Sequence, residues 1–509
     1  MTSRVLGLVR DQVLAYLFGT GAAMDAYYVA SRIPNLLRDL FAEGAMSAAF
    51  VPTFTRHLTT SGKDAAWRLG NLVLNALLVS TGVIVVLGIV FAEPLVRLLA
   101  AEDYTSDPGK LLLTVQLARI MMPTLALIAL AAALMGMLNS LRHFFIPALS
   151  PATFNVLTIL SAFTLVPLAP AMGLHPIVGI AVGTLLGGVA QLALQWPTLR
   201  REGFRYRPLL DWSDPGLRRV LVLMGPGTIG LAATQVNLLV NMALATGEGE
   251  GAVSALNFAF RLMYLPIGLF GVSIATAVLP SVSRHVAAQD EGQSRRTIAD
   301  GLSLMLMLNV PATVGLAVLA APIVRVIFER GEFTPQATTA TAAALQLYAV
   351  GLVGYSVVRI ASPVFYALGQ NRIPVMVSSV TVLINAVLNL ILVRVLGFTG
   401  LALGTSIAAL FNAVVLLVLL RRRLGGIDGQ RLAGSFVRIV LASAAMGAAA
   451  WAADRALAAW LPAGQLAVEI IRVGATIAVA LVVLALAAWA LRIGEFSRAM
   501  TLVTRRFRR

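Results

Sequence analysis

Apolar stretches long enough to cross a bilayer recur from one end of this chain to the other. A transmembrane helix needs about 20 mostly apolar residues, and the 509-residue sequence is 59% hydrophobic and only 12% charged. A soluble chain carries about twice that share of charge. The sequence therefore predicts an all-α, multi-pass membrane protein with about fourteen transmembrane helices. These are expected at residues 3–19, 25–51, 67–92, 111–139, 147–167, 175–195, 217–245, 252–281, 298–321, 337–367, 373–394, 399–420, 433–453 and 467–491.

Basic residues gather in alternate connections between these helices. The net charge of +16 could suggest a nucleic-acid partner, but its placement in short loops beside helix ends argues against one. The positive-inside rule puts these basic loops in the cytoplasm, together with both chain termini, as an even helix count requires. The basic C-terminal tail is interpreted as a membrane-retention and lipid-surface feature.

Three short motifs recur at nearly one spacing. The matches are PTFTRH (52–57) with PSVSRH (280–285), PLVR (94–97) with PIVR (322–325), and RHFFIP (142–147) with GQNRIP (369–374). The first two pairs lie 228 residues apart and the third 227. Three matches at nearly one offset indicate a duplication. Because the offset spans an even number of helices, both copies have the same orientation, which is a parallel repeat.

The repeat predicts the domain organisation. We expect an N-terminal lobe of six helices at 1–200 and a C-terminal lobe of six helices at 201–425. Residues 426–509 would add two further helices and the basic tail. Two such lobes leave a cavity between them, which is the layout of a transporter.

Two related segments, SRVLGLVRD (3–11) and SRIPNLLRD (31–39), place arginines inside predicted membrane helices. An arginine at the bilayer centre costs roughly 2.5–3.5 kcal/mol on insertion scales, so it must face water, protein or an anion. Arg10 and Arg38 fall at similar depth on antiparallel helices, and Arg261 lies in the middle of its own predicted helix. Guanidinium groups that outnumber the nearby acids favour an anionic ligand, and their forked donors suit phosphate oxygens.

The predicted anion site consists of Arg4, Arg10, Arg38 and Arg261. Pro34 and Asn35 interrupt the second helix between its arginines, as happens where backbone lines a cavity. A structural interpretation stays open, in which intramembrane polar residues form internal ion pairs and helix–helix hydrogen bonds. It is favoured for Arg119, Asn237, Asn241, Asn257, Arg359, Asn385 and Asn389.

Sequence motifs for catalysis are missing. The chain has no cysteine, which excludes disulfides and cysteine nucleophiles. Its two lysines, Lys63 and Lys110, do not belong to a nucleotide-binding glycine loop, and its four histidines form no metal-binding H-E-x-x-H motif. We therefore expect a protein that is not an enzyme and has no cofactor. Transport would run on an ion gradient or on the membrane potential.

Four segments carry a likeness to a known family. They are SRVLGLVRD (3–11), FGTG (18–21), DAYYVASRIPNLLRDLFAEGAMSAAFVP (25–52) and RLMYLPIGLFGVSIATAVLPSVS (261–283). Through these segments the chain resembles the MviN/MurJ family, the lipid II flippases of bacterial peptidoglycan synthesis. This family belongs to the multidrug and oligosaccharidyl-lipid exporter superfamily. The resemblance implies a substrate with an undecaprenyl tail, a diphosphate and a disaccharide–pentapeptide, carried across the bacterial cytoplasmic membrane. It also implies that the last two helices form a groove for the polyprenyl tail.

The resemblance assigns roles to particular residues. The family's functional arginines map onto Arg4, Arg10, Arg38 and Arg261, and its acidic positions onto Asp11, Asp25 and Glu43. Arg32 and Asn35 are expected to support the site. Expected partners are lipid II and membrane lipids, with the cell wall synthesis machinery as a further candidate.

The chain departs from the family at several positions. Asp39 stands where many members have a basic residue, and Tyr264 where some have an acid. Some members bind sodium through acids in helices 7 and 11, but this chain has only Gln235, Asn237, Asn241, Asn385 and Asn389 there, which disfavours sodium coupling. Arg4 also lies almost at the chain start, so we expect either a short first helix or an upstream start codon.

Two other functions stay open. The first is export of another lipid-linked oligosaccharide or of amphipathic drugs, although an exporter of cationic drugs would be expected to show an excess of intramembrane acids. The second is a non-transporting scaffold for cell wall enzymes. A scaffold would pair each arginine with an acid and would have no open cavity.

Overall fold

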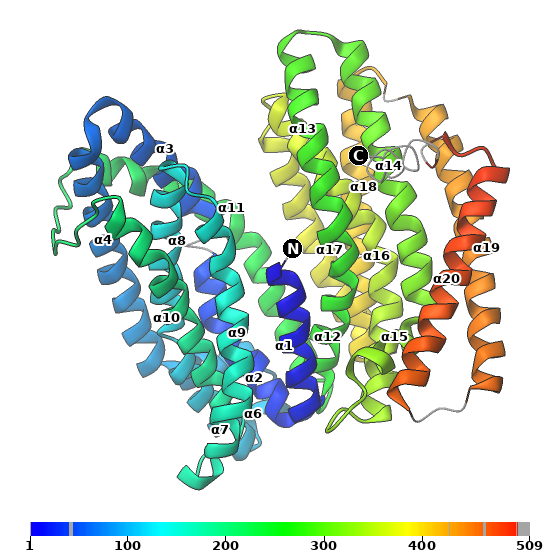
Figure 1. The fold of residues 1–509 in the computed structure, drawn as a ribbon, viewed down its shortest axis with the longest axis horizontal. Helices are drawn as coiled ribbons and strands as arrows, with labels where there is room; N and C mark the ends of the chain where they lie inside the picture. Colours follow the sequence, from blue (N-terminus) through cyan, green and yellow to red (C-terminus); the bar gives the residue numbers. More distant parts are fainter. Residues whose placement is uncertain (1, 40–43, 427, 462–464, 495, 497–509) are drawn as a thin grey trace. The chain divides into compact units, whose positions relative to one another are not determined.

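The described chain is helical, and no β-strand occurs among its described residues. The computed structural model describes residues 2–39, 44–426, 428–461, 465–494 and 496 (Figure 1). Within these residues, ten helices are long and apolar enough to cross a membrane. They are α4 (Gly62–Val90), α7 with α8 (Pro108–Met121 and Thr124–Ser140), α9 (Phe145–Leu168), α10 (Val178–Arg201), α14 (Glu291–Val318), α16 (Pro335–Ala367), α17 (Arg372–Leu396), α18 (Phe398–Arg423), α19 (Gly429–Trp460) and α20 (Leu466–Ala490). The predicted all-α membrane fold is confirmed, and the count of fourteen spans stays a prediction.

Shorter helices account for the other predicted segments. They are α1 (Thr2–Phe18), α2 (Ala22–Arg38), α3 (Gly44–Thr60), α12 (Ala252–Pro266), the π-helical turn η3 (Ile267–Gly271) and α13 (Val272–Ala287), alongside the longer α11 (Pro215–Thr246). The segment predicted as one helix at 252–281 is thus divided. Pro266 lies at the division, where a proline without an N–H interrupts the regular hydrogen-bond ladder. Short helices α5 (Ala92–Leu99), α6 (Glu102–Thr105) and α15 (Ala320–Phe328) and the 3₁₀ turn η2 (Pro170–Met172) complete the chain.

Helix boundaries repeat along the chain at the spacing of the sequence motifs. The helix ends that lie 228 residues apart are Phe18 and Thr246 in α1 and α11, Arg38 and Pro266 in α2 and α12, Val90 and Val318 in α4 and α14, and Leu168 and Leu396 in α9 and α17. Independent segments would not end in register four times. The ends of these helices therefore agree with the duplication inferred from the three motifs.

The chain divides into two compact units. The first comprises Met1–Ser254 with Arg330–Phe333, and the second comprises Ala255–Glu329 with Thr334–Arg509. Helix α11 packs against α3 within the first unit. A division into compact units does not test where a sequence repeat begins and ends. The boundaries expected from the sequence, at 1–200, 201–425 and 426–509, therefore stay a prediction.

In the first unit, aromatic side chains form the core where α3, α4 and α10 meet the segment after α10. Phe54 packs against Trp67, and Trp67 against Phe204, with ring centroids 5.8 and 5.3 Å apart. Helices α9 and α10 also approach closely. A Cβ on Gly179 would lie 2.6 Å from the backbone nitrogen of Val166, so only glycine permits this approach.

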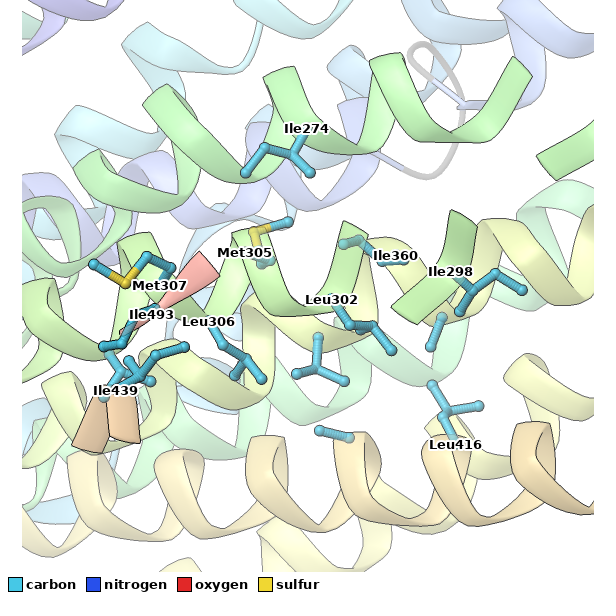
Figure 2. Close-up of a cluster of buried hydrophobic side chains, with 14 of the residues drawn as sticks. Ile274, Ile298, Leu302, Met305, Leu306, Met307, Ile360, Leu416, Ile439 and Ile493 are labelled. Atoms are coloured by element: carbon cyan, nitrogen blue, oxygen red, sulfur yellow. The ribbon is translucent and has the colours of Figure 1, made fainter. Parts of the chain in front are cut away.

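In the second unit, α14 lies at the centre of the hydrophobic core. Figure 2 shows Ile298, Leu302, Met305 and Leu306 of α14 among buried side chains of the neighbouring helices. Helix α14 contacts both α16 and α19, and α19 packs against α20. The C-terminal helix pair is thus attached to the second unit through the α14–α19 contact.

Candidate functional site

Arg10 and Asp11 form an ion pair on α1. The Arg10 Nη2 and Nε atoms lie 2.8 and 3.2 Å from Asp11 Oδ1. The Asp11 side chain is 2% exposed and that of Arg10 is 15% exposed. A buried charge needs a partner of this kind. An arginine has five N–H donors, and this ion pair uses two of those of Arg10.

Arg38 and Asp39 repeat this geometry at the end of α2. Arg38 Nη2 and Nε lie 2.8 and 3.1 Å from Asp39 Oδ1, and both side chains are 27% exposed. Gln235 of α11 extends the pair into a chain. Arg32 Nη2 donates to Gln235 Oε1 at 3.0 Å, and Gln235 Nε2 donates to Asp39 Oδ2 at 3.4 Å. Gln235 thus joins Arg32 to Asp39.

Asn35 and Glu43 were predicted to support the site. The Asn35 carbonyl accepts the backbone N–H of Asp39, and Pro34 is buried inside α2. This carbonyl therefore fixes the backbone of the residue that pairs with Arg38. Glu43 lies outside the described residues.

Asp25 caps the start of α12. Its buried carboxylate accepts hydrogen bonds from the backbone N–H of Gly251 at 2.6 Å, the backbone N–H of Ser254 at 2.8 Å and the Ser254 hydroxyl at 2.7 Å. In return, the Ala22 N–H at the start of α2 donates to Glu250 Oε1 at 2.9 Å. Carboxylates satisfy the first N–H groups of a helix and favour its positive end. The two helix starts, which are equivalent in the repeat, therefore cap one another.

The turn between α1 and α2, within the FGTG motif, is held by two other loops of the first unit. Glu332 N donates to Tyr16 O at 2.9 Å. Gly19 has φ +55°, and a Cβ there would lie 2.2 Å from Glu332 O. Gly251, with φ +87°, approaches the Thr20 carbonyl in the same way, at 2.4 Å. Glycine is required at both positions by its positive φ and by the lack of space.

Arg4 and Arg261 are exposed, the former on α1 of the first unit and the latter on α12 of the second. Near Arg261 in the sequence, Tyr264 receives a hydrogen bond from Arg359 Nη2 of α16. The Arg359 guanidinium also lies 5.9 Å from the centre of the Tyr264 ring, and Phe260 stacks on that ring at 5.6 Å. Arg359 thus joins α16 to α12, which agrees with the structural role expected for it.

Asn385 and Asn389 also have the geometry of structural residues. Asn389 Nδ2 donates to Asn385 Oδ1 at 3.3 Å, one turn away on α17, and both side chains are buried. Gly404 of α18 approaches so closely that a Cβ there would lie 2.0 Å from Asn389 Oδ1. The asparagines therefore contribute to the contact between α17 and α18.

Neither the reciprocal capping nor the role of Gln235 was predicted from the sequence. The sequence did contain a signal for the capping. Asp25 lies in the first turn of α2, and Glu250 lies just before α12, the equivalent helix of the repeat. Gln235 gave no such signal. Its importance arises from the packing of α11 beside α2.

The fold is similar to that of solved transporters of the MOP superfamily. The chain is similar to an inward-facing multidrug resistance MATE family transporter of this superfamily, with a TM-score of 0.71 over 84% of this chain and 96% of that one. At 16% sequence identity this likeness defines the fold alone.

More specific similarities define the family. A family model described as lipid II flippase MurJ matches residues 14–469. The chain is 38% identical to the probable lipid II flippase MurJ of Bdellovibrio bacteriovorus over 448 residues, 88% of this chain and 84% of the relative. It is 36% identical to that of Vibrio cholerae over 473 residues, 91% and 89% of the two chains. A solved lipid II flippase MurJ, in an inward closed conformation, is similar with a TM-score of 0.77 and 26% identity, over 96% of this chain and 97% of that one. The chain belongs to the MurJ family, which confirms the resemblance seen in the sequence.

Proposed function

We propose that this protein moves lipid II, the undecaprenyl-diphosphate-linked peptidoglycan precursor, from the inner to the outer leaflet of the bacterial cytoplasmic membrane. The observation that carries this proposal is membership of the MurJ family over residues 14–469. The relatives named above are described as lipid II flippases and match most of their length. The protein would act as a carrier by alternating access and not as a catalyst.

Arg10, Arg38 and Arg261 are proposed to bind the diphosphate, with Arg4 as an additional contact. Asp11 and Asp39 support this role because each holds an arginine in a fixed orientation before any ligand arrives. Donors that are ordered in advance lose less entropy on binding. The forked guanidinium group then offers paired N–H groups to phosphate oxygens.

Asp25 and the Arg32–Gln235–Asp39 chain are proposed to control access. The hydrogen bonds of Asp25 depend on how α2 and the start of α12 are placed, so they would form in one transport state and break in another. Glu43 is proposed to act with this group on the basis of the family resemblance.

Topology and energy source complete the proposal. Both termini would face the cytoplasm, with the basic loops on that side. The membrane potential or an ion gradient would drive transport, and the amides in α11 and α17 disfavour a sodium site. Helices α19 and α20 would form a groove for the polyprenyl tail.

The experiment that tests this function is replacement of the native flippase in a bacterium depleted of it. Expression of this chain should restore growth and remove the lipid II that accumulates on the inner leaflet during depletion. If this chain restores growth while lipid II still accumulates on the inner leaflet, the flippase assignment is contradicted. Restored export of a different lipid-linked oligosaccharide or of a drug, with lipid II unchanged, would support the alternative exporter. Failure of every transport assay despite normal membrane levels would favour the scaffold.

A further inference from the structure

Residues 202–214 connect α10 to α11 and lie alongside α4 in the first unit. They form turns but no helix. We call this stretch the linker segment. Two buried asparagines of α4, one turn apart, bind its backbone. Asn71 Nδ2 donates to Arg205 O at 3.1 Å, while Arg207 N donates to Asn71 Oδ1 at 2.8 Å. Asn71 thus makes the paired contact that a neighbouring strand would make.

Asn75 continues this attachment. Its Nδ2 donates to Arg207 O at 2.8 Å and to Leu209 O at 2.9 Å, and its Oδ1 accepts the Tyr206 hydroxyl at 2.6 Å. At the start of the segment, Phe204 is 1% exposed and packs against Trp67 and Trp196. The linker segment is therefore fixed in place and does not hang as a free loop.

The acids of the linker segment are engaged within the fold. Glu202 binds His143 Nε2 at 2.9 Å and Lys63 Nζ at 3.1 Å, and these hydrogen bonds lower the pKa of its carboxyl. Asp214 caps α11 by accepting from Gly216 N and Leu217 N at 2.8 and 3.2 Å, and Asp211 accepts from Ser213 N at 2.9 Å. These acids therefore have partners of their own.

Six arginines flank or lie within the same segment, and all are exposed. They are Arg200 and Arg201 at the end of α10, Arg205 and Arg207 in the linker segment, and Arg218 and Arg219 near the start of α11. No ion pair is formed by any of the six within the part of the chain that the structure describes. The result is a strongly cationic surface on a rigid backbone.

Large apolar and aromatic side chains are exposed on the same segment. Tyr206, Leu209, Leu210 and Trp212 are each between 39% and 47% exposed. Tyr and Trp are enriched where protein meets lipid headgroups, and basic residues beside apolar ones favour contact with anionic lipid surfaces. The segment also follows directly on α10, one of the helices long and apolar enough to cross a membrane.

We propose that the linker segment is a preformed docking surface for anionic phospholipid headgroups of the leaflet beside it. Arg205 and Arg207 bind the headgroup phosphate, and Leu210 and Trp212 enter the interface. Charge complementarity selects this occupant, because the segment offers exposed guanidinium groups whose local acids are already engaged. The surface shares no residue with the proposed lipid II site.

The test uses the full chain in nanodiscs and follows Trp212 fluorescence, isolated by subtracting the spectrum of W212F. The probes are phosphatidylglycerol and phosphatidylcholine, each brominated near the ester end of its acyl chains so that it quenches tryptophan on contact. We expect phosphatidylglycerol to quench at a lower mole fraction, with a preference on the order of tenfold that falls as salt is raised. In R205Q/R207Q the preference for phosphatidylglycerol should fall to about onefold, so that the two lipids quench equally.

A matched control neutralises two other exposed arginines of the same unit. R56Q/R142Q removes the same charge outside the linker segment and should keep the preference. N71A/N75A keeps all the arginines but releases the backbone, so it should also lose the preference. If N71A/N75A fails to fold, R205Q/R207Q still tests the proposal, because it alters only exposed side chains and should fold normally.

Several outcomes would overturn the proposal. They are equal quenching by the two lipids in the native chain, an unchanged preference in R205Q/R207Q, and loss of preference in the control. Inorganic phosphate and chloride are compared at equal ionic strength. If phosphate lowers the preference for phosphatidylglycerol more than chloride does, the surface binds free phosphate instead. The measurement does not involve transport, so its failure would leave the flippase proposal untouched.

Discussion

At the scale of single residues, Arg10 in α1 and Arg38 in α2 each obtain their counter-charge from the next residue in the chain. Neighbours on a helix point in different directions, so the forked guanidinium must bend back to reach the carboxylate. In both Arg10–Asp11 and Arg38–Asp39 it approaches one carboxylate oxygen through Nε and Nη2. This pairing agrees with the interpretation that intramembrane arginines form internal ion pairs. It also holds in place the N–H donors that an anion would contact.

The first prediction separates these roles. R10A, R38A and R261A should each abolish complementation of a flippase-depleted strain while membrane levels remain normal by immunoblot. R10K, R38K and R261K should restore growth only in part, because lysine keeps the charge but lacks the fork that matches phosphate. R119A provides the control, since Arg119 is exposed and its Nε atom donates to the Ile89 carbonyl. Full growth from all three alanine variants would return the arginines to the structural interpretation.

The second prediction concerns Asp25. D25A leaves the Gly251 and Ser254 N–H groups without their acceptor, which should lower the free energy of unfolding by about 1–3 kcal/mol. Denaturant unfolding in detergent measures this loss, and D25A/S254A tests whether the two residues act together. If D25A and S254A have strictly additive effects, the hydrogen bond that the Ser254 hydroxyl donates to Asp25 does not contribute as described.

At the scale of the helices, glycine decides how closely neighbours approach. Gly179 brings α10 against the backbone of α9, and Gly404 brings α18 against Asn389. The C-terminal pair has a polar connection as well, because Arg472 of α20 donates to Asp454 of α19 at 3.0 Å. Packing and polar contacts of this kind hold membrane helices together, since lipid supplies no hydrophobic driving force.

The third prediction tests the approach of α9 and α10. In G179A the new methyl group would meet the Val166 backbone at 2.6 Å, so the helices must separate, at a cost of about 1–3 kcal/mol. Thermal unfolding of purified protein should occur at a lower temperature. G82A is the matched control, because a Cβ on Gly82 meets nothing within 4 Å, and it should be neutral or slightly stabilising. Equal unfolding temperatures for the two variants would show that the α9–α10 contact is looser than described.

At the scale of the whole molecule, long helices of both units expose apolar side chains of the kind that lipid accommodates. Exposed Val, Leu, Ile and Trp residues recur along α4, α17, α19 and α20. A soluble protein does not expose apolar surface of this extent. The exposure agrees with a multi-pass membrane protein and leaves its orientation to the basic loops.

The fourth prediction tests that orientation. Single cysteines replacing Ser61, just before α4, and Ser106, between α6 and α7, can be labelled selectively because the chain has no cysteine. A membrane-impermeant thiol reagent added to intact spheroplasts should label S106C, and S61C should react only after permeabilisation. Both positions are exposed, so access is decided by the membrane. Labelling of S61C in intact spheroplasts would reverse the proposed topology.

The sequence by itself determined the features that depend on local composition and on repetition. Apolar runs defined the helices, since a helix hydrogen-bonds its backbone groups within its own segment, as a membrane interior requires. Three motifs revealed the duplication, and a long N-terminal motif identified the family. These signals are local, so they could be read without knowing which helices touch.

Only the tertiary structure decided which residues act together across the chain. It gave Asp25 its partners at Gly251 and Ser254, placed Gln235 between Arg32 and Asp39, and fixed residues 202–214 along α4. Each of these contacts joins residues far apart in sequence. Polar groups in helices and loops carry no periodic signal for their distant partners, because the partner is chosen by how the helices pack.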